Sequence, residues 1–305
     1  MVIQAAALTK RFGDVVALDG LTMEMPEGTV GLLGPNGAGK TTFLRLLLGL
    51  LKPTSGRATV MGLDCQARPL AIRERIGYMP EHDCLIPEMT GIGLVAYMAR
   101  VSGLDTNTAL GRAHDMLDFV GVGEERYRKV EEYSTGMKQR VKLGQALVHD
   151  PDLFLFDEPT AGLDPEGRSE MLDLLKAISS MEGKSMLISS HLLPDVEDIC
   201  KHVVIINGGQ VVAQGELKDL LSSELDTLKV RIRGDANAFL SALSKRGVNA
   251  QTKPSFIQVP KKEGVEELIF SAALETGVQI RYLGAEARSL EEVFLQIVEG
   301  GEAEW

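Results

Sequence analysis

Gly34-Pro35-Asn36-Gly37-Ala38-Gly39-Lys40-Thr41 is the stretch that decides the fold of this chain, because it fits the pattern G-x-x-x-x-G-K-[ST]. Glycines in this pattern let the backbone close around an anion, so that successive amide N–H groups point inward. The apolar run Thr29–Leu33 precedes the loop and predicts a buried strand, and Thr41–Leu50 follows it and predicts a helix. The positive end of that helix would face the anion. The unit therefore predicts a phosphate-binding loop.

The residue types in this loop predict a site for ATP with Mg²⁺. We expect the ammonium of Lys40 to reach the β- and γ-phosphates and the hydroxyl of Thr41 to bind Mg²⁺. Thr42 is placed to hydrogen-bond the α-phosphate. By composition alone the pattern arises in about one chain in a hundred of this length, and the flanking strand and helix make a chance match rarer still. The expected ATP-binding residues here are Gly34, Pro35, Asn36, Gly37, Ala38, Gly39, Lys40, Thr41 and Thr42.

Two carboxylates follow a second apolar run, Leu153–Phe156. A buried parallel strand would deliver Asp157 and Glu158 to the carboxyl edge of the sheet, where ligands bind in such folds. Asp157 fits a Mg²⁺ ligand, and Glu158 fits a general base that orients the attacking water. The alternative is a pair that only caps the turn at Pro159. The phosphate-binding loop upstream favours the metal and water roles.

His191 follows a third apolar run, Met186–Ser190. A lone histidine in such a place is more often structural than catalytic. At the same sheet edge, however, it would be able to donate a hydrogen bond to the γ-phosphate or to Glu158. The other histidines have no comparable position and are interpreted as structural or surface residues: His82, His114, His149 and His202.

The composition of the 305 residues is that of an ordinary globular protein, with 44% hydrophobic and 25% charged residues. A net charge of -11 argues against nucleic acid as a partner. No run approaches the roughly 20 apolar residues that span a bilayer, and no signal peptide is evident, so we expect a cytoplasmic chain. The widely spaced Cys65, Cys84 and Cys200 predict neither a zinc site nor a disulfide framework.

Strand and helix patterns together predict an α/β domain over residues 1–222, with a mostly helical insert at about 90–150. Helices are expected at Ala109–Val120 and Thr135–Val148 in the insert and at Gly167–Ser180 after it. A strand at Ser185–Ser189 and a hairpin over His202–Gly215 complete this domain.

The remaining residues, 223–305, predict a small ferredoxin-like α+β domain. Its expected elements are a strand (Thr227–Arg233), a helix (Ala236–Arg246), a strand pair (Val248–Val259), a helix (Gly264–Glu275), a strand (Val278–Leu283) and a helix (289–298).

The segment Tyr133-Ser134-Thr135-Gly136-Met137-Lys138-Gln139-Arg140 resembles the signature motif of ABC (ATP-binding cassette) ATPases, usually LSGGQ. The resemblance covers residues 1 to about 222. It implies a P-loop cassette with a RecA-like core and a helical subdomain, which pairs head to tail with a second cassette, here a homodimer. Ser134 and Gly136 would then contact the partner's γ-phosphate, Asp164 would lie in the D-loop at the interface, and Phe12 would stack on adenine. For Phe12, the alternative is a plain core phenylalanine.

Three residues depart from the family pattern. Glu81 stands where the family usually has a glutamine that contacts Mg²⁺ or the water, so metal contact is retained as an expectation and its coupling role is in question. Thr135 replaces a glycine, and a β-branched side chain would be strained if that backbone needs a positive φ. Met137 replaces the usual glutamine. The loop, Asp157, Glu158 and His191 remain, so we expect activity.

The C-terminal stretch Ser289-Leu-Glu-Glu-Val-Phe-Leu resembles the end of cassettes that serve type-two ABC exporters. The resemblance implies an ATPase that drives a separate integral membrane permease from the cytoplasmic face of the membrane. The C-terminal domain would stabilise or regulate the cassette dimer. The alternative is a non-transport ABC ATPase, a translation or DNA-repair factor. It is disfavoured because the chain carries one phosphate-binding loop, no coiled coil or zinc module, and an acidic net charge.

Overall fold

The computed structural model describes residues 1–82, 84–222, 227–253, 255–285, 290–291 and 293–294. Two compact units are present, Met1–Leu217 and Lys218–Val293. The predicted domain boundary at residue 222 falls at the end of α8 (Leu217–Ser222), which lies where the two units join. The helix predicted at 289–298 falls largely outside the described residues.

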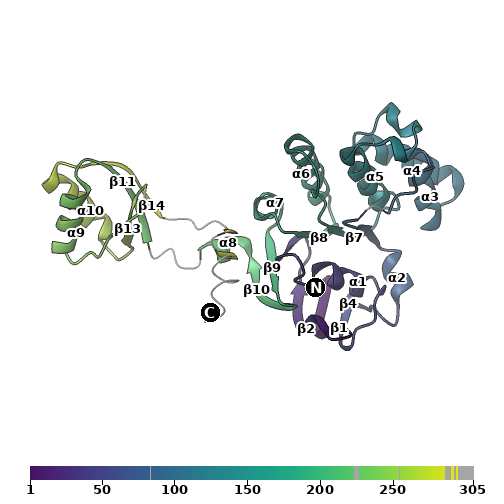
Figure 1. Ribbon diagram of the computed structural model, residues 1–305, viewed down its shortest axis with the longest axis horizontal. Helices are drawn as coiled ribbons and strands as arrows, with labels where there is room; N and C mark the ends of the chain where they lie inside the picture. The colour runs from purple at the N-terminus through teal and green to yellow at the C-terminus, as the bar shows by residue number, and fades with distance from the viewer. Residues whose placement is uncertain (83, 223–226, 254, 286–289, 292, 295–305) are drawn as a thin grey trace. The chain divides into compact units, whose positions relative to one another are not determined.

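A six-stranded sheet forms the centre of the first unit (Figure 1). Five neighbouring strands are parallel, and β10 joins the edge as the antiparallel arm of the predicted hairpin. Every residue of β3, β7 and β8 is buried, as expected when both faces of a parallel sheet are covered. The strands, in order across the sheet, are β10 (Gln210–Glu216), β9 (His202–Asn207), β3 (Thr29–Leu33), β8 (Ser185–Ser190), β7 (Leu153–Asp157) and β6 (Ile76–Met79).

A second, antiparallel sheet packs with helix α1 (Lys40–Leu47) in one hydrophobic core. Phe43 and Leu44 of α1 are fully buried and belong to the same cluster as Leu32 of β3 and Met23 of β2. The start of α1, and with it the phosphate-binding loop, is therefore fixed by burial of the helix behind it. The strands of this sheet are β2 (Val15–Met25), β1 (Ile3–Phe12), β4 (Ser55–Val60) and β5 (Leu63–Asp64).

Helices predominate between β6 and β7, and Figure 1 shows α3, α4 and α5 grouped at one side of the sheets. The helices predicted at 109–120 and 135–148 are confirmed as α4 and α5. Each of these helices begins at a side-chain cap. Thr90, Asp105 and Ser134 accept a backbone hydrogen bond from the first turn of α3, α4 and α5, respectively. The bounds are α2 (Pro69–Arg73), α3 (Gly91–Val101), α4 (Thr106–Phe119), two 3₁₀ turns (Glu124–Tyr127 and Val130–Glu132) and α5 (Thr135–Leu147).

After β7 the chain forms α6 (Pro165–Ser179), which confirms the helix predicted at 167–180, and then β8 and α7 (Leu193–Ile199). The start of α6 is capped by Asp164, whose Oδ1 accepts a hydrogen bond from the N–H of Gly167 at 3.0 Å.

The second unit is a four-stranded antiparallel sheet with two helices, and it confirms the predicted ferredoxin-like topology. The chain runs strand, helix, strand pair, helix, strand, and the first strand lies between the third and the fourth. Phe239 and Ile269, one from each helix, are fully buried against Val230 and Val259 of the sheet. Its elements are β11 (Thr227–Arg233), α9 (Ala236–Lys245), β12 (Gln251–Thr252), β13 (Ile257–Pro260), α10 (Val265–Thr276) and β14 (Gln279–Ala285).

Helix α5 lies so close to β6 that only glycine fits at one position. A Cβ atom on Gly77 would lie 2.1 Å from the backbone oxygen of Ala146 and 2.9 Å from the ring of Pro151. Both neighbours are conformationally restrained, because one is helix backbone and the other is proline. Gly77 therefore sets the distance between the helical region and the edge of the six-stranded sheet.

We expect Gly77→Ala to destabilise the protein by about 1–3 kcal/mol, the usual cost of overpacking a core. Gly111→Ala is the matched control, because a Cβ on Gly111 in α4 has no heavy atom within 4 Å. This control should be neutral or stabilising by about 0.5–1 kcal/mol, since alanine favours a helix over glycine. Parallel denaturant unfolding curves of the two variants measure the difference. Equal midpoints would contradict the close packing of α5 on β6.

Candidate active site

The predicted phosphate-binding loop forms one wall of a cavity of about 290 Å³. Gly37 and Gly39 have φ angles of 82° and 106°, in the left-handed region that glycine tolerates. A Cβ on Gly39 would also lie 2.5 Å from the backbone oxygen of Ala17 in β2. Both glycines are therefore required by the path of the loop. The lining residues are Ala17, Pro35, Asn36, Gly37, Ala38, Gly39, Lys40, Thr41, Thr42, Glu81 and Glu158.

The ammonium of Lys40 is buried at the base of this loop, with its side chain 7% exposed. It donates hydrogen bonds to the backbone oxygens of Gly34 at 2.7 Å and Pro35 at 3.4 Å. It also lies 3.3 Å from Oε1 of Glu158. A buried cation needs such partners to offset its lost hydration. These contacts join the loop after β3 to the end of β7, so that a phosphate in the cavity would meet a cation already held in place.

Asp157, the last residue of β7, has one satisfied and one unsatisfied oxygen. Its Oδ1 accepts a hydrogen bond from Ser189 Oγ on the neighbouring strand at 2.5 Å. Its Oδ2 is buried without a hydrogen-bond partner among the described residues. A buried carboxylate oxygen of this kind needs a donor or a cation. Oxygen atoms of carboxylates and hydroxyls are ligands that Mg²⁺ takes in proteins, so Asp157 and Thr41 of the phosphate-binding loop fit that ion.

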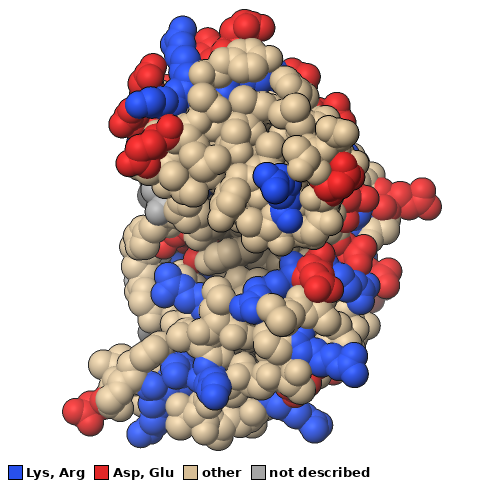
Figure 2. Space-filling model, turned by 90° about the vertical axis from the view of Figure 1, so that its right-hand side faces the viewer, with Lys and Arg blue, Asp and Glu red and all other residues tan. Residues whose placement is uncertain are grey.

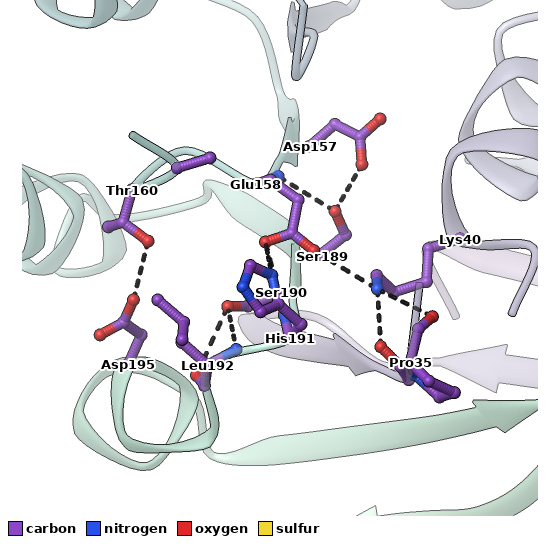
Figure 3. A network of polar contacts seen from close by, with 12 residues as sticks. Pro35, Lys40, Asp157, Glu158, Thr160, Ser189, Ser190, His191, Leu192 and Asp195 are labelled. Atoms are coloured by element: carbon purple, nitrogen blue, oxygen red, sulfur yellow. Dashed lines mark hydrogen bonds and ion pairs between the residues drawn. The ribbon is translucent and has the colours of Figure 1, made fainter. Parts of the chain in front are cut away.

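Glu158 is held by contacts on all sides (Figure 3). Its N–H donates to Ser189 Oγ at 3.1 Å, and its Oε2 lies 2.8 Å from Nδ1 of His191. Its φ angle of 51° is unusual for a residue other than glycine. Backbone strain of this kind persists only where surrounding contacts enforce it, and it is concentrated at functional sites. The Glu158 carboxylate contacts both Lys40 and His191, so the three predicted catalytic residues lie together.

The signature residues lie in a second hollow, away from the loop. Ser134, Gly136 and Asp164 all line it, so the structure brings these three predicted residues to one surface. Ser134 caps α5, because its Oγ accepts a hydrogen bond from the N–H of Met137 at 3.3 Å. Thr135 is the first residue of α5 and has no positive φ, so the condition under which a β-branched side chain would be strained at this residue is not met.

Phe12 and Glu81 differ in how close they come to the loop. Glu81 lines the cavity with Lys40. Phe12 ends β1, is 47% exposed and has Lys10 Nζ 4.7 Å from its ring centre. The exposure excludes the alternative of a core phenylalanine, although Phe12 does not line the cavity.

Sequence reasoning missed two residues that position this site. Ser189 contacts Asp157 and the backbone of Glu158. A serine inside an otherwise apolar strand was the available signal, but its partner depends on the register that pairs it with Asp157. Lys142 of α5 is 1% exposed and donates to the backbone oxygen of Glu81 at 3.0 Å. No pattern in the sequence marks it.

The comparisons with known proteins agree with this geometry. The family model "ABC transporter" matches residues 18–161. The daunorubicin resistance ATP-binding protein DrrA3 of Streptomyces coeruleorubidus is 33% identical over 294 residues, which are 94% of this chain and 93% of that protein. The Nod factor export ATP-binding protein I of Cupriavidus metallidurans is 34% identical over 302 residues, 97% of each chain.

Among solved structures, the ATP-binding subunit of an ABC transporter is 28% identical with a TM-score of 0.66, and the match covers 73% of this chain and 93% of that one. The dimeric bacterial cassette MJ0796 is 25% identical with a TM-score of 0.65, over 70% of this chain and 98% of that one.

Fold and site together define an ATP-hydrolysing cassette of the P-loop class. This chain belongs to the family of ABC transporter ATP-binding proteins, and it resembles the subunits of type-two exporters. The family assignment supports the transport interpretation and not a translation or DNA-repair ATPase. None of the described helices is both long enough and apolar enough to cross a bilayer.

We expect Ser189→Ala to reduce kcat about tenfold or more while ATP binding is retained. The substitution removes a hydrogen bond to an ionised carboxylate, worth about 1.5–3 kcal/mol, and frees the position of Asp157. Ser190→Ala is the matched control, because Ser190 is equally buried but its Oγ contacts the backbone of Leu192. Steady-state ATPase assays with a fluorescent ATP titration test this. A similar loss in both variants would contradict a specific role for Ser189.

Proposed function

We propose that this chain is the ATPase of an exporter, in which two cassettes close on ATP and reopen after hydrolysis to drive a separate membrane permease. The observation that carries the proposal is the Lys40–Glu158–His191 network, with Lys40 and Glu158 buried, beside a carboxylate with an unsatisfied oxygen. That arrangement suits a phosphate, a metal ion and an attacking water in one place. Export is supported by relatives that are named for daunorubicin resistance and Nod factor export.

In the proposed reaction Glu158 is the general base that orients the water and accepts its proton. His191 holds the Glu158 carboxylate through Nδ1 and presents the rest of its half-exposed ring to the γ-phosphate. Lys40 stabilises the charge that develops on the transferred phosphoryl group. Mg²⁺ would be held by Thr41 and Asp157, with Glu81 as a further oxygen ligand, and when bound it neutralises phosphate charge.

The second partner in the proposal is another copy of this chain. Ser134 and Gly136 begin α5, where backbone N–H groups and a serine hydroxyl suit a γ-phosphate. Asp164 lines the same hollow. A cassette that brings this surface to its partner's phosphate-binding loop would complete each site. Phe12 is exposed, as a residue that stacks on adenine needs to be.

The permease is proposed to dock between Glu81 and Arg100. Figure 2 shows the face that carries α2 and α3, hollowed between the helical region and the sheet region. Large apolar side chains are exposed there, with Leu70 at 68%, Tyr97 at 47% and Val101 at 62%. Exposed apolar side chains on these two helices favour a protein partner. The chain would then sit on the cytoplasmic face of the membrane through the permease.

We expect Glu158→Gln to reduce hydrolysis by about 10²-fold or more, because a general base contributes about that factor. ATP affinity should be retained, and the variant should accumulate an ATP-bound dimer. Turnover assays and light scattering with ATP measure both effects. Glu182→Gln, on the exposed turn after α6, is the control and should behave as the wild type. An unchanged turnover rate in Glu158→Gln would refute the assigned role.

A tagged chain purified from gently solubilised membranes of its host should bring a polytopic membrane protein at a fixed ratio. Mass spectrometry of the co-purified proteins identifies that permease. Recovery of a ribosome or a DNA-repair complex without a membrane protein would instead exclude the transport role and leave the ATPase site intact.

A further inference from the structure

The C-terminal half of helix α5 and the residues just after it contact β6 and the loop that follows β6. Beyond the C-terminal end of α5, Nε2 of His149 lies 3.1 Å from the backbone oxygen of Ile76. Nearer the middle, Ala146 packs against Gly77 at a distance that excludes any side chain. One turn earlier, Nζ of Lys142 donates to the backbone oxygens of Pro80 at 2.9 Å and Glu81 at 3.0 Å. Helix and loop therefore form one packed body up to the edge of the ATP cavity.

The contact made by Lys142 is the least expected of the three, because a lysine side chain is rarely buried and only 1% of this one is exposed. Burying an ammonium costs several kcal/mol unless hydrogen bonds compensate it, and an apolar residue of similar volume often does as well or better for stability. The two carbonyl oxygens belong to consecutive residues, and a lysine has enough donors to bind both. Lys142 thus fixes the backbone of the loop that carries Glu81, at a position where stability alone would favour a methionine or leucine.

A second polar contact on the same helix holds the loop after Glu158. Gln139, one turn before Lys142 and on the same face, is buried, and its Nε2 donates to the backbone oxygen of Ala161 at 3.1 Å. Ala161 leads into Asp164, and Glu81 lines the ATP cavity. Helix α5 is therefore hydrogen-bonded both to the loop that carries Glu81 and to the loop that leads to Asp164, and its N-terminal end carries Ser134 and Gly136.

We propose that Lys142 is a positioning residue that fastens the Glu81 loop to α5, so that the nucleotide bound by one cassette determines how that cassette presents Ser134 and Gly136 to its partner. A shift of Glu81 toward the bound nucleotide moves the loop backbone, and the two carbonyl contacts carry the shift to the helix. Coupling of this kind requires a contiguous packed element that both sites bias, and α5 with β6 is such an element. The proposal rests on the ATP-dependent dimer proposed above.

The test compares Lys142→Met with Lys184→Met. Lys184 also donates to two consecutive backbone oxygens, of Asp150 at 3.3 Å and Pro151 at 2.9 Å, but it precedes β8 at the opposite edge of the sheet from the site. Removing it controls for the loss of a lysine that binds backbone. The measurements on the full chain are the affinity of the monomer for a fluorescent ATP analogue, kcat, and the Hill coefficient of ATP hydrolysis.

For Lys142→Met we expect ATP affinity within about twofold of the wild type, kcat reduced about tenfold and a Hill coefficient near one, from typical coupling strengths. Lys184→Met should retain the wild-type kcat and Hill coefficient. Wild-type kcat and cooperativity in Lys142→Met would overturn the proposal, and so would a large loss of ATP affinity, which would place Lys142 in the nucleotide pocket. Failure of Glu158→Gln to dimerise would instead refute the proposed dimer itself.

If Lys142→Met does not fold, Cys84 provides a second measurement in the Glu158→Gln chain. Cys84 is exposed and lies close to Glu81 in the sequence, whereas burial raises the pKa of Cys65 to about 12 and also raises the pKa of Cys200. Thiol labelling should therefore report the Glu81 loop. At protein concentrations where the chain is monomeric, ATP should change the labelling of Cys84 and the amide exchange of the first turn of α5 with the same midpoint. Different midpoints would overturn the proposal.

Discussion

The buried ammonium of Lys40 is the contact on which the rest of the site depends. It links three segments that are distant in the sequence, since it binds the backbone after β3 and the carboxylate after β7, and that carboxylate in turn holds His191 after β8. The parallel sheet supplies the geometry, because β3, β8 and β7 are neighbours and end at the same edge. Lys40 is the first residue of α1, so the burial of α1 in the hydrophobic core fixes the position of Lys40.

The parts of this site that could be predicted from the sequence are those carried by contiguous motifs. The phosphate-binding loop needs glycines at fixed spacing, and Asp157, Glu158 and His191 come at the ends of short apolar runs whose length and flanking turn residues favour buried strands. The alternation of elements after residue 226 was likewise sufficient for the ferredoxin-like topology, because short antiparallel strands and amphipathic helices leave few arrangements.

The parts that could not be predicted depend on register and on packing distance. Ser189 acts on Asp157 only because the two residues are paired across β7 and β8, and a shift of one residue would turn its side chain to the other face. Gly77 is required by the closeness of α5, which is visible only once the helix is placed. Lys142 is hidden for the same reason, since the two backbone oxygens to which it donates would be presented by any residue.

Lys142 binds the Glu81 loop through backbone oxygens, and this matters because Glu81 stands where the family usually has a glutamine. Lys40 and Lys142 each donate to backbone carbonyl oxygens of their loops, and these hydrogen bonds do not depend on which side chain the loop carries. A glutamate in place of the family's usual glutamine alters the charge that faces the nucleotide, but it leaves the attachment of the loop to α5 intact. In the proposed mechanism, the side chain that would meet the metal and phosphate can thus vary while the hydrogen bonds between the loop backbone and α5 are retained. The departure at Glu81 is therefore compatible with the proposed ATPase activity, because the hydrogen bonds from Lys142 to this loop are made to its backbone and not to the Glu81 carboxylate.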